Sequence, residues 1–355
     1  MRHLFSSAAA LGGLVMLTLA AASPAAAAAY PKDNLPPEYV IGTSPAPPTG
    51  GGKGLIEEWR VGTKDQVDGR FGSAGSLSGN SFRASYDPGD RALYVPTAAG
   101  ETYVLDRATL QPQGEFQSIP GGRIARVTPD HKTVLILSPQ GLAAYSASDW
   151  QRLFRVPIGG NALAVSLSGR HAFVGGNDSD VVTEINLPSG TVAHIFPVKG
   201  SSALAWANGQ LFSADMKTGI VSVIHPASGR IVRISTPEVD PAFSYRHIHR
   251  ATAGLMQLAA SPDQLVVYAA GFSGHILMFS AKNDRYLGEI PVHVDPAGPN
   301  RLSGLTVVNG GADAVVTAEN ADESALVSLA DGKVLKRFAH TASNRWITVE
   351  PGPVA

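Results

Sequence analysis

The chain has 355 residues, and its 28 Lys and Arg nearly balance its 29 Asp and Glu, giving a formal net charge of -1. Because a surface that binds nucleic acid needs an excess of basic residues, this balance argues against a nucleic-acid partner. There are 0 cysteines, which excludes disulfides, zinc–thiolate sites, iron–sulfur clusters, a thiol nucleophile and covalently attached c-type haem. Charged residues make up only 16%, while 38 glycines and 25 prolines supply many turns, a combination that favours an all-β globular protein.

The N-terminal segment, residues 1–29, has the features of a secretory signal. A short polar start is followed by an apolar stretch at 11–22 and then by an alanine-rich run. The apolar stretch is shorter than the roughly 20 residues that a membrane span requires, and small residues follow it, as in cleaved signals. We therefore expect an exported protein, periplasmic or secreted, with no membrane span after cleavage.

Residues 30–54 are rich in proline and glycine. This composition is typical of an extended or flexible segment, and we expect a lead-in to the folded part. Within it, residues 38–41 (EYVI) have the composition of a short strand.

From about residue 80 onward the chain repeats one pattern, four short apolar segments separated by turns, with a period of roughly 40 residues. A repeat of four short strands with this period is typical of a β-propeller blade. Because one such unit cannot bury both of its faces, the units must pack side by side in a ring. The six complete copies cover residues 83–118, 124–160, 162–200, 204–237, 255–292 and 302–340.

Both ends of the chain carry pieces of a further repeat. Residues 345–350 (RWITVE) have the pattern of a first strand, residues 55–61 (LIEEWRV) that of a last strand, and residues 39–42 that of a possible second. Joining these pieces would complete a blade from both termini and close the ring. We therefore predict a seven-bladed β-propeller over residues 55–355, with six blades as the alternative.

Several phrases in the repeats resemble those of a known family. They are VLDRATL at 104–110, INLPSGTV at 185–192, IHPASGRIV at 224–232, and the strand-to-turn phrases VTPDH at 127–131 and ASPDQ at 260–264. In these phrases the chain resembles the secreted bacterial YVTN-type (YncE-like) β-propeller repeat proteins over nearly all of residues 80–350. The resemblance implies the propeller fold but no single activity, because propellers with similar repeats include quinoprotein dehydrogenase subunits, haem d1 carriers, lactonases and binding proteins.

One link between repeats is unusually long. In a propeller, the links from a fourth strand to the next first strand lie on the same face as the turns between second and third strands. The link at 235–254 (STPEVDPAFSYRHIHRATAG) is several times longer than the equivalent links at 158–161 and 198–202. Long ordered links in compact domains are commonly functional, so we expect the site on this face.

Basic and aromatic side chains gather on this face in the predicted fold. Arginine binds carboxylates and phosphates through two hydrogen bonds, so an anion is a suitable ligand. The ligand-binding residues that we predict are Tyr245, Arg246, His247, His249, Arg250, His275, His293 and Arg301.

Histidines in the same region also suggest a metal site. Two histidines two residues apart on an extended segment point the same way, which suits Zn or Cu. We therefore consider His247, His249 and His275 as metal ligands. Residues 177–180 (NDSD) offer oxygen ligands for Ca²⁺, although the same residue types are ordinary turn formers.

Two functions remain open from the sequence. In the first, the exported propeller binds a ligand or protein partner on its loop face and has neither catalysis nor a cofactor of its own; the partner is a small anionic ligand or an envelope or secreted protein. In the second, it is a metal- or cofactor-dependent enzyme or carrier, of the quinoprotein, haem d1 or lactonase kind, which holds a single metal ion or haem with the His247/His249 loop. The chain has no recognisable nucleophile or acid–base motif, which favours the first. Convergence of the histidines would favour the second.

Overall fold

A computed structural model describes residues 38–44, 55–61, 67–72, 83–87, 92–106, 109–294, 298, 300–319, 323–339 and 348–351. Residues 1–29 lie outside this set, so the signal segment stays a prediction. Neither of the short helical segments in the described part, η2 (Tyr245–Arg250) and η3 (Asn309–Gly311), is long and apolar enough to cross a membrane.

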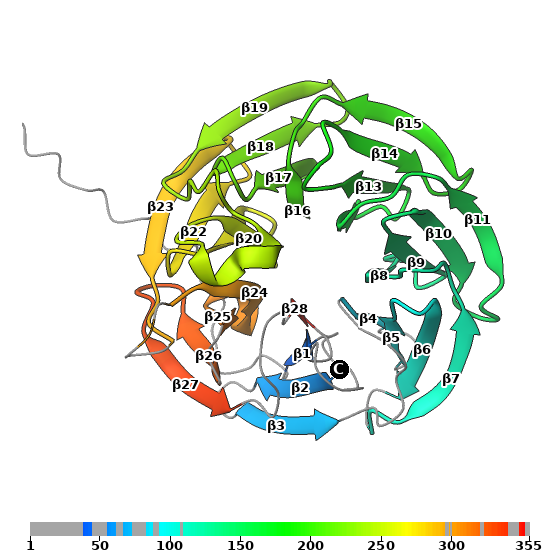
Figure 1. Cartoon of the computed structure of the whole chain (residues 1–355), viewed down its shortest axis with the longest axis horizontal. Helices are drawn as coiled ribbons and strands as arrows, with labels where there is room; N and C mark the ends of the chain where they lie inside the picture. Colours follow the sequence, from blue (N-terminus) through cyan, green and yellow to red (C-terminus); the bar gives the residue numbers. More distant parts are fainter. Residues whose placement is uncertain are drawn as a thin grey trace, which may run out of the picture.

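The protein is an all-β propeller, in which four-stranded antiparallel sheets are arranged around a central axis (Figure 1). Six of the sheets are blades of four consecutive strands, with the first strand of each blade nearest the axis and the fourth at the rim. The propeller fold and its repeats of four strands are therefore confirmed.

The strands of these blades follow the predicted repeats. The first three blades contain β4 (Ser85–Asp87), β5 (Ala92–Pro96), β6 (Glu101–Asp106) and β7 (Pro112–Gln117); β8 (Ile124–Val127), β9 (Thr133–Ser138), β10 (Gly141–Ser146) and β11 (Arg152–Val156); and β12 (Ala162–Val165), β13 (His171–Gly175), β14 (Val182–Asn186) and β15 (Thr191–Phe196). The next three contain β16 (Ser201–Ala207), β17 (Gln210–Asp215), β18 (Ile220–His225) and β19 (Arg230–Ser235); β20 (Leu255–Ala260), β21 (Val266–Gly271), β22 (His275–Ser280) and β23 (Arg285–Pro291); and β24 (Leu302–Val308), β25 (Asp313–Ala318), β26 (Glu323–Ser328) and β27 (Val334–Ala339).

A further four-stranded sheet, the terminal sheet, joins the two ends of the chain in the order β28-β1-β2-β3. Its strands are β28 (Thr348–Pro351), β1 (Glu38–Ser44), β2 (Leu55–Val61) and β3 (Val67–Gly72). The sheet packs against the blade β24–β27 through a small apolar cluster of Val40, Val61, Val308, Val315 and Leu326.

The terminal sheet corrects two predictions. Residues 55–61 form its third strand rather than its last, because β3 pairs along the outer side of β2. The sheet also begins before residue 55, since β1 lies inside the segment 30–54 that we predicted as a lead-in. The pattern of residues 38–41 as a strand is confirmed, and the strand extends to Ser44.

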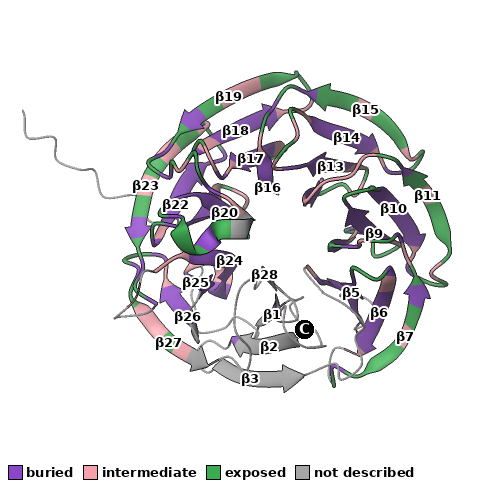
Figure 2. Ribbon diagram, in the orientation of Figure 1, coloured by how far each residue is buried: buried purple, intermediate pink, exposed green. Residues whose placement is uncertain are grey.

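The core lies between the blades. The middle strands are buried on both faces, as β17 and β18 illustrate, whereas the outermost strands, such as β15, face solvent (Figure 2). Strands buried on both faces must be almost continuously apolar, which explains the short hydrophobic runs in each repeat. Aromatic pairs join neighbouring blades: Trp206 stacks on Phe173 at 5.3 Å between ring centroids, and Trp150 stacks on Phe116 at 5.9 Å.

Candidate functional site

The long link runs from the end of β19 to the start of β20 and contains η2. Figure 1 shows this helix as the yellow-green coil beside β20, on the side of the central axis. Because η2 is a 3₁₀ helix, the histidines do not lie on an extended segment as we predicted. Within the helix, Ile248 is buried, whereas His247, His249 and Arg250 are exposed.

The three histidines do not form a metal site. The rings of His247 and His249 are 6.3 Å apart and nearly perpendicular, and His275 instead places Nδ1 2.8 Å from the hydroxyl of Ser273. Among the described residues, no group of three or more His, Asp or Glu side chains could hold a metal ion. The described geometry therefore gives no support to His247, His249 and His275 as a ligand set, because the helical turn and the Ser273 contact direct these rings differently.

Other predicted site residues have separate roles. His293 lies 3.4 Å from the amide of Asn300, and its backbone carbonyl accepts a hydrogen bond from Arg337. The guanidinium group of Arg301 lies 5.8 Å from the ring centroid of Phe272, a distance suited to a cation–π contact. Tyr245 and Arg246 belong to η2, and the structure does not describe their side chains.

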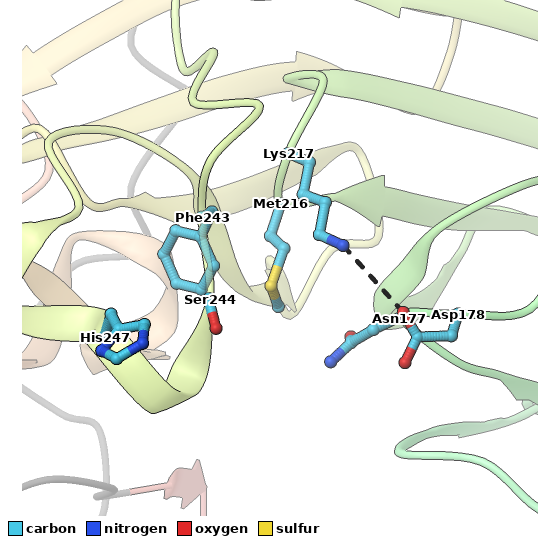
Figure 3. A pocket seen from close by; sticks show the side chains of 7 residues that line it. All are labelled: Asn177, Asp178, Met216, Lys217, Phe243, Ser244 and His247. Atoms are coloured by element: carbon cyan, nitrogen blue, oxygen red, sulfur yellow. Dashed lines mark ion pairs between the residues drawn. The ribbon is translucent and has the colours of Figure 1, made fainter.

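The link borders a cavity of about 440 Å³, which we call the loop-face cavity. Three segments meet there: the turn between β13 and β14, the turn between β17 and β18, and the link itself (Figure 3). Second-to-third-strand turns and a fourth-to-first-strand link therefore share one face, as predicted. The lining residues are Asn177, Asp178, Met216, Lys217, Phe243, Ser244 and His247.

The cavity has an apolar side and a polar side. Met216 and Phe243 are each 2% exposed and form the apolar side. On the polar side, the ammonium group of Lys217 lies 4.0 Å from Oδ1 of Asp178 (Figure 3). Asn177 lies beside them, and its Oδ1 is buried without a hydrogen-bond partner.

Local turn chemistry places Lys217 at this edge. The carboxylate of Asp215 accepts hydrogen bonds from the backbone N–H of Lys217 at 2.9 Å and the hydroxyl of Thr218 at 2.7 Å. Gly219 closes the turn with φ of 65°, and a Cβ there would lie 2.7 Å from the carbonyl oxygen of Glu238. A side chain at this position would therefore strain the turn and push the link away.

A buried carboxylate holds the link in place. Glu238 is 1% exposed, and its Oε2 accepts the N–H of Gly254 at 2.7 Å and that of Ser273 at 3.3 Å. The Ser273 hydroxyl donates to Oε1. Burial raises the pKa of Glu238, while these hydrogen bonds act in the opposite direction. Both ends of the link are thus tied to each other and to the turn before β22.

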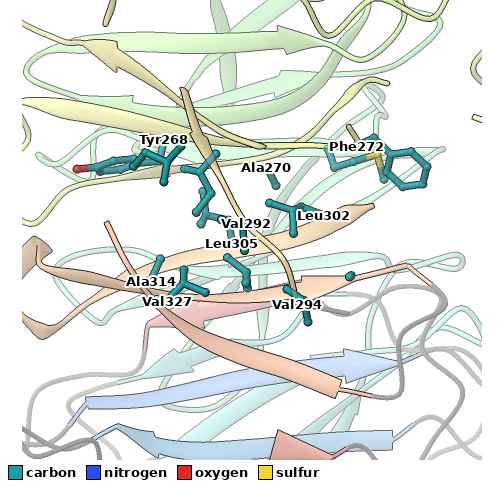
Figure 4. Close-up of a cluster of buried hydrophobic side chains, with 14 of the residues drawn as sticks. Tyr268, Ala270, Phe272, Val292, Val294, Leu302, Leu305, Ala314 and Val327 are labelled. Atoms are coloured by element: carbon teal, nitrogen blue, oxygen red, sulfur yellow. The ribbon is translucent and has the colours of Figure 1, made fainter. Parts of the chain in front are cut away.

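An aromatic contact secures the middle of the link. Phe243 packs edge-on against Phe272, with 5.6 Å between ring centroids. Phe272 belongs to the largest buried cluster, which lies between the blades β20–β23 and β24–β27 (Figure 4). The apolar side of the cavity is therefore continuous with the core of the ring.

Of the predicted ligand-binding residues whose side chains the structure describes, only His247 lines the loop-face cavity. Residues 177–180, which the sequence offers as a calcium loop or a turn, form a turn in which Asp178 pairs with Lys217 and Asp180 with Lys199. Sequence reasoning missed Met216 and Lys217. The predicted fold could have identified Met216 and Lys217, because turns between second and third strands lie on the same face of the ring as the long link.

The comparisons with known proteins establish the fold alone. No family model matches the chain, and no curated protein matches its sequence. Among solved structures, "Crystal structure of RRP9 WD40 repeats" is similar with a TM-score of 0.64 and 10% identity, over 77% of this chain and 84% of that chain. The chain is a β-propeller. Proteins with this fold have many unrelated functions, so the function must be argued from the site.

Proposed function

We propose that the protein is an exported β-propeller that binds a small ligand bearing a carboxylate in the loop-face cavity, without catalysis of its own. The observation that carries the proposal is a cavity of about 440 Å³ bordered by a link that is anchored at both ends and in the middle. Its volume lies in the range of about 300–1,000 Å³ that small-molecule sites occupy. Export is supported by the pattern of residues 1–29.

The lining supports recognition rather than chemistry. Its titratable groups are Asp178, Lys217 and His247, and the first two are 4.0 Å apart with side chains 95% and 43% exposed. Catalytic acids and bases are usually desolvated, whereas the side chains of Asp178 and Lys217 are open to solvent. An anionic group of a ligand would find Lys217 and His247 within one cavity.

The proposal is tested by screening small carboxylates against the purified protein, using chemical-shift changes in labelled side chains. We expect shifts at Met216 and Phe243, and a loss of binding in Lys217→Met. Lys132→Met is the matched control, because Lys132 is a cavity-lining lysine on the other face of the ring. Binding that survives in Lys217→Met and His247→Ala, or shifts confined to other blades, would contradict the proposal.

We also propose that the terminal sheet acts as a seventh blade that closes the ring. The pairing of β28 with β1 and the packing of Val40 and Val61 on the last blade support this role. A chain truncated after residue 347 lacks β28, so we expect a lower midpoint in thermal unfolding and concentration-dependent association through the exposed edge of β1. An unchanged midpoint would favour a ring closed by six blades.

A further inference from the structure

We infer that the loop-face cavity takes a free α-amino acid with an apolar side chain, bound through both its carboxylate and its ammonium group. The inference rests on the proposed function, since it names the ligand class of that same cavity. Three features of the lining carry it: paired charges of both signs, an amide with an unused acceptor, and an apolar side opposite them.

The paired charges are the first feature. Lys217 and Asp178 are 4.0 Å apart, which exceeds the roughly 2.7–2.9 Å of a charge-assisted hydrogen bond. Exposed pairs of this kind interact weakly, so each group remains available to a ligand. A ligand with only a negative charge would be repelled by Asp178, and one with only a positive charge by Lys217. A zwitterionic head group instead offers its carboxylate to Lys217 and its ammonium group to Asp178.

The amide of Asn177 is the second feature. Its Oδ1 is buried and has no hydrogen-bond partner, an arrangement that proteins usually avoid. The side chain lies beside Asp178 on the polar side of the cavity (Figure 3). A half-turn of the amide exchanges its donor and acceptor, so it can accept from an ammonium group or donate to a carboxylate. This capacity suits a head group that carries both.

The apolar side is the third feature. Phe243 and Met216 come from different segments and lie side by side, with Met216 between Phe243 and the charged pair (Figure 3). Methionine is flexible and polarizable, so it adapts to apolar groups of different shapes. We therefore expect the side chain of leucine, methionine or phenylalanine to pack here. Strongly polar amino acids would leave this surface unpaired and bind more weakly.

The test compares ligands that differ by one charged group. Titration calorimetry of the purified protein uses L-phenylalanine, 3-phenylpropionate, which lacks the ammonium group, and 2-phenylethylamine, which lacks the carboxylate. Because a hydrogen bond to a charged group is commonly worth about tenfold or more in affinity, we expect L-phenylalanine to bind at least about tenfold tighter than either analogue. L-leucine should bind similarly, and L-glutamate more weakly.

Two variants assign the charged groups. Lys217→Met should weaken L-phenylalanine and 3-phenylpropionate, whereas Asp178→Asn should weaken L-phenylalanine but leave 3-phenylpropionate unchanged or tighter. Lys132→Met, in the cavity on the other face, should change neither. All three side chains are exposed or line open surface, and far-ultraviolet circular dichroism would confirm that each variant is folded.

The outcomes separate this inference from the proposed function. Equal affinity for L-phenylalanine and 3-phenylpropionate, dependent on Lys217 and with weaker binding of 2-phenylethylamine, would overturn the amino-acid inference and leave a carboxylate-binding cavity. Binding of a peptide ending in phenylalanine without binding of free phenylalanine would also overturn it. If neither these ligands nor the carboxylate screen disturbs the cavity residues, the proposed function itself fails.

Discussion

The propeller has cavities of similar size on its two faces, and they differ in how they are built. The loop-face cavity, of about 440 Å³, depends on the link between β19 and β20. The second cavity, of about 370 Å³, which we call the turn-face cavity, lies between the blades β8–β11 and β12–β15. Its lining residues are Thr128, Asp130, Lys132, Thr133, Leu153, Phe154, Gly169, Leu187, Pro188 and Ser189.

The turn-face cavity is made of parts that the repeat supplies in other blades too. In six blades an N–H near the end of the third-to-fourth-strand turn donates to the carbonyl four residues earlier; these donors are Leu110, Trp150, Gly190, Gly229, Asp284 and Gly332. The first hairpin also recurs, with a hydroxyl of Thr128, Ser166 or Ser261 accepting an N–H five residues on. A recess between such turns follows from the repeat, whereas the loop-face cavity requires a segment specific to one position. This contrast favours the specific segment as the place of function.

The largest expected effect tests whether the link is part of the core. Phe243→Ala removes a ring that is 2% exposed and packed on Phe272, and buried Phe→Ala changes commonly cost about 3–5 kcal/mol. Phe154→Ala, the matched change at the turn-face cavity, removes a partly buried ring and should cost clearly less. Urea unfolding of both variants measures the difference. Equal losses would show that the two cavities are equally integrated with the core.

The next effect concerns the buried carboxylate. Glu238→Ala leaves the N–H of Gly254 without its acceptor, and an unsatisfied buried group costs about 1–3 kcal/mol. We therefore expect a fall of about 2 kcal/mol in unfolding free energy, together with faster hydrogen exchange at Gly254. Glu238→Gln keeps one acceptor and should lose less. Unchanged exchange at Gly254 in Glu238→Ala would mean that the link is held by other contacts.

The same carboxylate gives a pH dependence with a definite sign. Burial raises the pKa of Glu238 above its ordinary value of 4.5, so the folded state holds the proton more tightly than the unfolded chain does. Its contribution to stability is therefore full below pH 4.5 and is lost as pH rises through the folded-state pKa. The hydrogen bonds from Ser273 and Gly254, and to a smaller extent the electrostatic effect of His275, lower the pKa and so act in the opposite direction. As pH rises through this range, the unfolding free energy of the wild type should fall relative to that of Glu238→Gln. If the wild type instead became more stable than Glu238→Gln with rising pH, the assignment to Glu238 would be refuted.

The sequence predicted the blades because their signals are local. Short apolar runs and turn residues recur within each repeat, and the turn ending at Asp284 forms the same backbone hydrogen bond as the one ending at Gly229, although their side chains differ. The sequence did not predict β3, because two glycines weaken the strand signal of VDGRFG and the strand gains its partner from β2. The local sequence pattern also led to a wrong prediction for the backbone of the link. The alternation His247-Ile248-His249 suggested an extended segment, but burial of Ile248 is achieved by a 3₁₀ turn.

The site was harder to predict because its contacts join distant parts of the chain. Glu238 and Ser273 are separated by 35 residues, and only the folded ring brings them together. Gly271 shows how closely they approach, since a Cβ there would lie 2.4 Å from Oε1 of Glu238. No spacing rule in a single sequence reveals such a contact. The composition of the link drew attention to the face on which the loop-face cavity lies, while the lining residues had to come from the structure.

The smallest expected effect is at the rim of the turn-face cavity. Leu153 is 55% exposed although it is a large apolar residue, and Leu→Ser at an exposed position away from special features usually changes stability by no more than about 0.5 kcal/mol. If this cavity is only a consequence of the repeat, Leu153→Ser should leave both unfolding and ligand binding unchanged. A measurable loss of affinity for any ligand of the loop-face cavity would couple the two faces. A loss of association with a protein from the same compartment would instead assign a docking role to the turn face, and the contrast between the two cavities would no longer separate function from architecture.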